Sequence, residues 1–214
     1  MQQFLATVFD SNDVWAIGTA VPLVICSIAA LALIAERLVY LLSRRGLPLK
    51  RHNKVLEQIH HQELEAALTE LEQAKPYYLP AVKCLEEHAN EPKEVREEAV
   101  AITMHGISHG MRRRMSGLLT VASLAPMLGL LGTIIGLMRS FKDIGAHDGP
   151  VEPSIVADGL WQALTTTAAG LVIAVICVLT HALLSSRVRH ALAEAGDLLN
   201  RLNQSIERQQ RSKP

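Results

Sequence analysis

Residues 125–138 read APMLGLLGTIIGLM and lie at the centre of a long uncharged stretch. The stretch begins after Arg114 and ends before Arg139, so a helix formed by it is long enough to cross the hydrocarbon core of a bilayer, which takes about 20 residues. Near one side of this helix lie three glycines, Gly129, Gly132 and Gly136. Helix packing in lipid relies on small residues that let two backbones approach closely. Together with Pro126, the glycines predict a packing surface, and Thr133 places one hydroxyl in the middle of it.

Two further uncharged runs of similar length flank this stretch in the chain of 214 residues. The three predicted transmembrane helices are residues 14–36, 115–141 and 159–184. Hydrophobic residues make up 49% of the chain and aromatic ones only 4%, as expected where small aliphatic side chains pack helix against helix. A soluble domain of this size rarely contains three such runs. The sequence therefore predicts an all-α membrane protein with long cytoplasmic helical extensions.

The basic residues predict how the chain crosses the membrane. Arg and Lys follow the first and third spans, and Arg112, Arg113 and Arg114 precede the second as topology anchors. Since basic residues favour the cytoplasmic side, the N-terminus is predicted outside and the C-terminus inside. The remaining segments are a periplasmic N-terminus at 1–13, a cytoplasmic helical domain at 37–114, a periplasmic loop at 142–158 and a cytoplasmic C-terminal helix or tail at 185–214.

Helical periodicity also marks the polar part of the chain. One amphipathic helix is predicted from the spacing of Leu56, Ile59, Leu64, Leu68 and Leu71. Residues 75–80 break it, and Pro92 marks the start of another helix. No further helix-breaking residue precedes Pro126, so residues 93–141 are predicted to form one continuous helical rod.

The first half of the third span is unusually polar. It contains Gln162, Thr165, Thr166 and Thr167 within two helical turns. Each hydroxyl can bond to a carbonyl one turn earlier in its own helix, and this alternative stays open for every single threonine. As a group, they favour a polar face toward a bundle interior or a wet pathway. The uncharged cores of the three spans contain no Asp, Glu, Lys or Arg, so a titrating group for proton movement would have to come from a partner.

Other classes of function have little support. The chain has 21 basic and 21 acidic residues, so bulk charge does not indicate nucleic-acid binding. Three cysteines do not indicate a disulfide framework. His105 and His109 are one turn apart, as metal ligands can be, but a solvated helix face is the favoured interpretation. No nucleophile–base arrangement or phosphate loop is found, so we expect neither an enzyme nor a cofactor or metal.

Two motifs resemble a known family. Residues 125–141, APMLGLLGTIIGLMRSF, resemble the signature of the ExbB/TolQ/MotA proton-channel family, and residues 159–171, GLWQALTTTAAGL, resemble its companion in the third helix. The residues of the first motif resemble the ExbB branch more than the TolQ branch, and three spans resemble these two branches rather than the four-span flagellar branch. The resemblance implies a homo-oligomeric ring, with a pentamer expected, in the lipids of a Gram-negative inner membrane. It also implies an ExbD-type single-span partner that carries the proton-binding Asp, and a TonB-type protein through which proton flow energises transport across the outer membrane.

The resemblance also implies roles for particular side chains. Thr133 and Thr167 match the hydroxyls that face the partner's carboxylate, and Gln162 and Thr166 would join them in lining the pore. Gln162 stands where the family usually has glutamate, and an amide carries neither charge nor proton. Two alternatives therefore remain: a TolQ-like subunit for envelope integrity, and a membrane scaffold that holds a partner helix without conducting.

Overall fold

The computed structural model describes the chain in five ranges: 14–43, 46–61, 63–113, 115–145 and 153–211. Within these ranges the regular structure is helical, and they contain no strand. The chain forms two compact units. The membrane unit comprises the described residues of 1–37 and 114–183, and the polar unit comprises those of 38–113 and 184–214.

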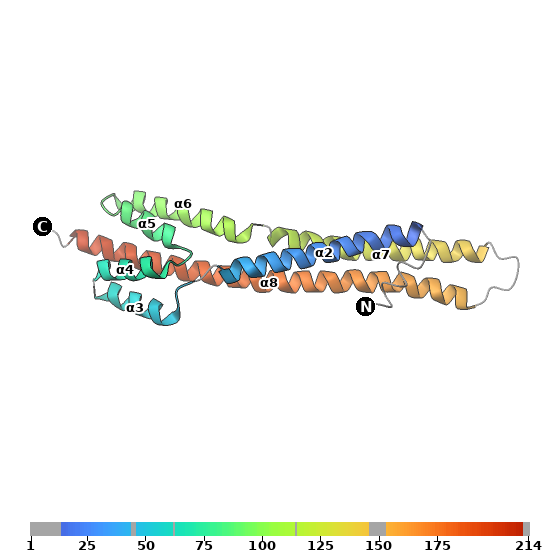
Figure 1. The fold of residues 1–214 in the computed structure, drawn as a ribbon. Helices are drawn as coiled ribbons and strands as arrows, with labels where there is room; N and C mark the ends of the chain where they lie inside the picture. The colour runs from blue at the N-terminus through green and yellow to red at the C-terminus, as the bar shows by residue number, and fades with distance from the viewer. Residues whose placement is uncertain (1–13, 44–45, 62, 114, 146–152, 212–214) are drawn as a thin grey trace. The chain divides into compact units, whose positions relative to one another are not determined.

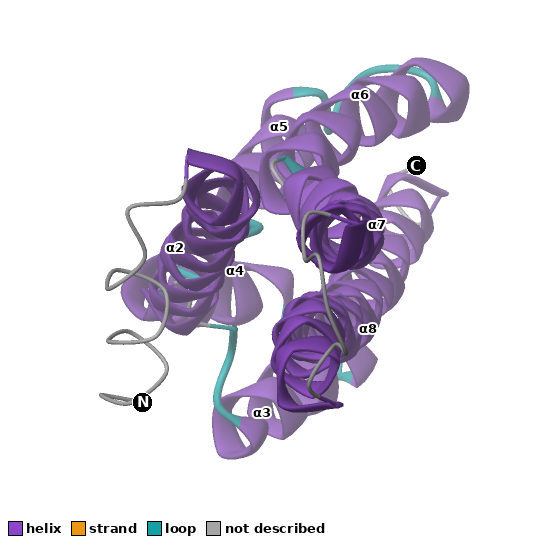
Figure 2. Cartoon of the chain, turned by 90° about the vertical axis from the view of Figure 1, so that its right-hand side faces the viewer, coloured by secondary structure: helices purple, strands orange, loops and turns teal. Residues whose placement is uncertain are grey.

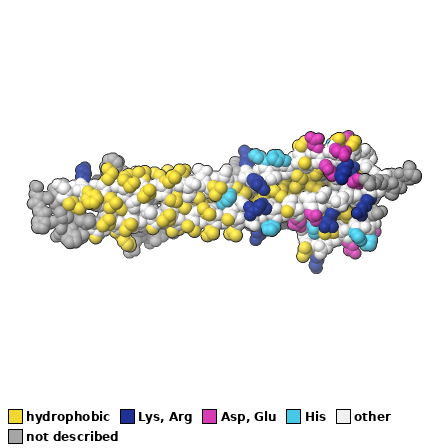
Figure 3. Space-filling model, turned by 180° about the vertical axis from the view of Figure 1, so that it is seen from behind, with side chains coloured by type: hydrophobic (Ala, Val, Ile, Leu, Met, Phe, Trp, Pro, Cys, Tyr) yellow, Lys and Arg dark blue, Asp and Glu magenta, His cyan; other side chains and the backbone are white. Residues whose placement is uncertain are grey.

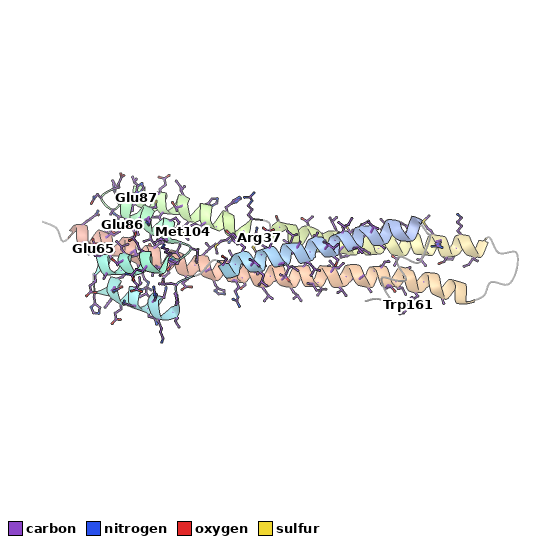
Figure 4. All side chains as sticks on the ribbon, in the orientation of Figure 1. Arg37, Glu65, Glu86, Glu87, Met104 and Trp161 are labelled. Atoms are coloured by element: carbon purple, nitrogen blue, oxygen red, sulfur yellow. The ribbon has the colours of Figure 1, made fainter. Side chains whose placement is uncertain are left out.

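Most of the membrane unit comes from three long helices: α2 (Val14–Ser43), α7 (Met115–Gly145) and α8 (Pro153–Arg211), the last parts of α2 and α8 belonging to the polar unit (Figure 1). All three helices are long and apolar enough to cross a membrane. Figure 3 shows hydrophobic side chains over the surface of this unit and most of the charged ones over the polar unit. Met127 is 66% exposed and Trp161, labelled in Figure 4, is 73% exposed. Such a surface suits lipid or other membrane helices, and the predicted all-α membrane protein is confirmed.

The helices are longer than the predicted spans. Helix α2 continues to Ser43, α7 continues to Gly145, and α8 already begins at Pro153, so helix occupies both ends of the predicted loop. Residues 146–152 and the predicted N-terminal segment 1–13 lie outside the described residues. Viewed end-on, α7 and α8 lie side by side with α2 next to α7 (Figure 2).

In the polar unit, the single amphipathic helix predicted around residues 56–71 is wrong. The structure has two helices, α3 (Leu49–His60) and α4 (Leu64–Ala74), which pack against each other. The amide of Glu63 donates to the carbonyl of Gln58, and this bond closes the turn between them. Lys54 Nζ, on α3, donates to Glu70 Oε2 at 2.7 Å and thereby lowers the pKa of that carboxyl. Val55 of α3 and Ala67 of α4 are fully buried.

The continuous rod predicted for residues 93–141 is also wrong. Helix α6 (Lys93–Arg112) ends before the membrane helix, and Arg113 has an extended backbone with ψ 137°. The break does not occur at any of the glycines in this stretch. It occurs in the run of arginines, where ending the helix places Arg112 at the negative end of the helix dipole.

The core of the polar unit takes buried residues from α5 (Leu79–Glu87), α6 and the last part of α8, and also from α3 and α4. The predicted break is confirmed at residues 75–78, although α5 already begins at Leu79, and the predicted helix start at Pro92 is confirmed. Four residues that recur at helical spacing along α8 are buried: Leu198, Leu199, Leu202 and Ile206. Tyr77 donates its hydroxyl to the carbonyl of Ala191, and burial, with a smaller contribution from Glu194, raises its pKa to about 12. The phenol therefore stays neutral at physiological pH.

Lys75 ends α4 in the left-handed region, at φ 46°. Residues with a side chain are strained there, whereas glycine is not. We expect Lys75→Gly to raise the free energy of unfolding by up to about 1 kcal/mol. Lys75→Ala removes the same charge but keeps Cβ, so it should not stabilise the protein. Thermal unfolding measures the difference, and equal Tm values for the two variants would contradict the prediction.

Candidate functional site

The glycines of α7 pack directly against α8. A Cβ added at Gly129 would lie 2.9 Å from Cα of Thr167. One added at Gly132 would lie 2.5 Å from Oγ1 of Thr166, and one at Gly136 would lie 2.9 Å from Cβ of Ala163. Real Cβ atoms do not approach other atoms this closely, so the three glycines allow the two helices to touch. The predicted packing surface is thus occupied by α8 within the same chain.

Small residues of α8 also belong to this close contact between α7 and α8, which we call the seam. They were not predicted from the sequence. A Cβ at Gly170 would collide with the carbonyl of Ala125, and one at Gly159 would collide with the hydroxyl of Ser140. The seam therefore extends over residues 125–140 of α7 and 159–170 of α8. The signal was present in the sequence, since Gly159, Ala163 and Gly170 recur at helical spacing.

Two of the predicted site hydroxyls bond to neighbouring carbonyls of α7. Thr167 Oγ1, on α8, donates to the carbonyl of Gly129 on α7 at 2.9 Å. Thr133 Oγ1 donates to the carbonyl of Leu130 within α7 at 2.7 Å. The two acceptors are consecutive carbonyls, so both hydroxyls bond to the same turn of α7. Both side chains are half-buried, and each keeps its oxygen lone pairs for an acceptor role.

The other polar residues of the third span behave differently. Thr165 Oγ1 donates to the carbonyl of Trp161 at 2.7 Å, within its own helix. Thr166 Oγ1 does the same to Ala163 at 2.7 Å and has only a long contact of 3.4 Å with the Gly129 carbonyl. Bonding to a preceding turn, which the sequence left open, therefore satisfies these two hydroxyls. Gln162 lies in α8, and its side chain is outside the described residues.

Pro126 lies inside α7 and is half-buried. Because proline lacks an amide hydrogen, it cannot donate to the carbonyl of Ala122 one turn earlier. Its neighbour Ala125 is fully buried, and the Ala125 carbonyl is the atom that Gly170 approaches. The proline thus lies beside the closest backbone contact of the seam.

The arginines and histidines singled out in the sequence lie outside the seam. Arg112 and Arg113 are exposed, and Arg114 lies outside the described residues. His105 and His109 are both exposed, in line with a solvated helix face. Among the residues that the structure describes, no group of three His, Cys, Asp or Glu side chains is placed to hold a metal ion.

The glycine seam and the paired hydroxyls lie within a stretch that matches a known family. A sequence model of the MotA/TolQ/ExbB proton channel family matches residues 52–196, which is more than half of the chain. The chain belongs to this family. The MotA/TolQ/ExbB match includes both motifs and most of the polar unit.

Individual relatives point to the ExbB branch. The chain is 36% identical to biopolymer transport protein exbB1 of Vibrio cholerae over 189 residues, which are 87% of this chain and 83% of that protein. It is 32% identical to the Tol-Pal system protein TolQ of Haemophilus influenzae over 112 residues, 52% of this chain and 48% of that protein. It is 37% identical to biopolymer transport protein ExbB of Aquifex aeolicus over 84 residues, 39% of this chain and 56% of that protein. The chain is thus an ExbB-like member of a membrane transport family.

Proposed function

We propose that this chain is the ring-forming subunit of an inner-membrane proton channel that works with an ExbD-type single-span partner. In this role it uses the proton motive force to energise TonB-dependent transport across the outer membrane of a Gram-negative bacterium. The observation that carries the proposal is the pair of hydroxyls, Thr133 and Thr167, fixed on consecutive carbonyls of α7. Family membership and the ExbB-like relatives support it.

The direction of the two hydrogen bonds suggests what the site does to a proton. A carbonyl can only accept, so both threonine O–H groups are committed to backbone oxygens. Only the lone pairs of the two threonine oxygens remain available to a partner. They can accept a hydrogen bond from a protonated carboxylic acid, but they cannot donate one to a carboxylate. Hydrogen bonding to the neutral form raises a carboxyl pKa. The pair thus favours a partner carboxyl that holds its proton while it lies in the membrane.

The arrangement in the membrane follows the charge pattern. We place the N-terminus outside and the polar unit inside, with Arg112, Arg113 and Arg114 as topology anchors among the lipid head groups. Copies of the chain form the ring, with a pentamer expected. The partner's single helix, with its Asp, lies in the central pore beside Thr133 and Thr167. Gln162 and Thr166 complete the proposed pore lining.

A proton-flux assay tests the proposal. The chain and its single-span partner are reconstituted into vesicles, and a pH-sensitive dye follows proton entry under an imposed gradient. Thr133→Val and Thr167→Val each keep the side-chain volume but remove the hydroxyl, so we expect each to lower flux by about tenfold or more. Thr→Ser at either position keeps the hydroxyl and should retain most of the flux.

Thr165→Val is the matched control. Thr165 lies on α8, like Thr167, and its replacement by valine removes a hydrogen bond to a carbonyl of the preceding turn of α8. Thr165 is not one of the two hydroxyls proposed to face the partner. Its flux should therefore match that of the unmodified complex. No flux from the intact complex, or equal flux in all three valine variants, would overturn the channel as described.

One residue favours a second candidate function. Gln162 replaces the glutamate that the family motif usually has, and a non-conducting scaffold for the partner helix needs no proton carrier there. A complex that assembles but conducts neither with Gln162 nor with Gln162→Glu would support the scaffold. The TolQ-like role is separated by complementation of cells that lack either the ExbB-type or the TolQ-type subunit.

A further inference from the structure

A groove of about 160 Å³ lies in the polar unit between α6 and the last part of α8. Its lining comes from α5, α6 and α8 and consists of Leu85, Glu97, Val100, Ala101, Met104, Gly196, Leu199, Asn200 and Asn203. Figure 4 labels Met104 on α6, with Glu86 and Glu87 on the neighbouring α5. The groove is open to solvent, because Ala101 and Gly196 in its wall are both exposed.

The groove has an apolar floor and room for one more aliphatic side chain. Leu85 is buried, and Leu199 is 3% exposed. Along α8 the wall is left open by Gly196, where an added Cβ would meet no atom within 4 Å. Filling such a space with an apolar group removes apolar surface from water, which favours binding.

The rim of the groove is acidic. Glu94 lies on α6 one turn before the lining residue Glu97, and Glu98 lies one turn before the lining residue Ala101. These two carboxylates are exposed and have no ion-pair partner in the described part of the chain. The nearby cations are already engaged, since Lys93 lies 3.9 Å from Glu97 and Arg201 lies 3.0 Å from Asp197. The uncompensated charge at the rim is therefore negative.

We infer that this groove, which we call the α6–α8 groove, binds the basic cytoplasmic tail of the single-span partner. The inference rests on the proposed function, which places the polar unit in the cytoplasm. Cytoplasmic segments next to a membrane span are rich in Lys and Arg. One apolar side chain of such a tail fills the space beside Gly196, and its neighbouring cations pair with Glu94 and Glu98.

Site-specific photocrosslinking in cells tests the occupant. The full-length chain carries p-benzoylphenylalanine in place of Ala101, which lines the groove, and is co-expressed with its single-span partner. The matched control carries the same probe in place of Ile102, which is the next residue and is 67% exposed but does not line the groove. We expect an adduct from position 101 that mass spectrometry maps to the partner's basic tail, and little adduct from position 102.

Two sets of variants test the two parts of the inference. Gly196→Leu fills the groove, whereas Gly106→Leu places the same side chain on α6 at a glycine that also has no atom within 4 Å of an added Cβ. We expect only Gly196→Leu to remove the adduct. Glu94→Lys combined with Glu98→Lys should weaken binding of the partner's tail to the groove by about tenfold, because both rim charges then repel the tail.

The outcomes separate the inference from the function on which it rests. The partner could co-purify while position 101 gives no adduct, or an adduct no stronger than that from position 102. The complex then forms as proposed, but the groove does not bind the tail. An adduct to a second copy of this chain, or one unchanged by Gly196→Leu, also overturns the inference. If the partner does not co-purify at all, both the proposed function and the assigned occupant are wrong.

Discussion

Gly129→Leu is expected to separate α7 from α8 and to abolish the paired hydroxyl site. The added Cβ would lie 2.9 Å from Cα of Thr167 and 3.0 Å from the carbonyl oxygen of Thr166, and both are backbone atoms that cannot rotate away. Overpacking of a tight contact costs about 1–3 kcal/mol, and the bond from Thr167 to the Gly129 carbonyl is lost as well. Thermal unfolding of the purified protein in detergent should show a Tm lower by about 2–4 °C per kcal/mol lost.

Gly18→Leu is the control for this prediction. Gly18 lies in α2, in the same membrane unit, and an added Cβ there would meet no atom within 4 Å. It should leave Tm nearly unchanged. Gly129→Ala, which adds only the Cβ, should already lower Tm, and Gly129 variants should also lose proton flux. If Gly129→Ala and Gly18→Ala unfold at the same temperature, the α7–α8 seam does not have the close contact described here.

Arg96→Ala is expected to destabilise the polar unit more than any substitution on its surface. Arg96 is only 1% exposed. Its Nε donates to Asn203 Oδ1 at 2.5 Å, and its Nη1 donates to the carbonyls of Ala89 at 3.1 Å and Glu91 at 3.4 Å. One side chain thus ties the turn before α6 to α8. Its removal leaves buried acceptors without donors and a cavity, which together cost about 3 kcal/mol or more.

A decrease in Tm of about 6–12 °C corresponds to this loss for a chain of this size. Limited proteolysis should show earlier cleavage between α5 and α6, where the Arg96 bonds hold the turn. Arg208→Ala, at an exposed arginine of the same α8, should change neither Tm nor cleavage. A similar response from the two variants would mean that Arg96 does not anchor the turn.

Much of the fold could be predicted from the sequence. Membrane helices are encoded locally, because about 20 uncharged residues in a row have no stable alternative to a helix in lipid. The stretch 125–138, with its glycines and Thr133, could therefore be recognised both as a span and as a packing surface. The need for a partner could also be read from the sequence. The uncharged cores of the spans contain no ionisable group, so a proton carrier has to come from another chain.

Boundaries and hairpins were predicted less well. The sequence suggested one helix where α3 and α4 fold back on each other, because the apolar spacing continues across the turn at His61. It also suggested a rod through Arg113, since no proline or asparagine marks the break there. In both places the chain gains more from packing against another element than from continuing a helix, and that gain depends on distant residues.

The sequence by itself determined the class of protein, its three apolar spans, and the residues that carry its signature. Only the tertiary structure decided which glycine meets which residue, and that Thr167 rather than Thr166 makes the firm bond to the Gly129 carbonyl. It also decided that Arg96, which shows no sequence signal, anchors the polar unit. The physical reason is that a span is selected by composition over about 20 residues. A hydroxyl's partner is instead selected by rotation of one helix against another, and a rotation of 100° per residue cannot be read from composition.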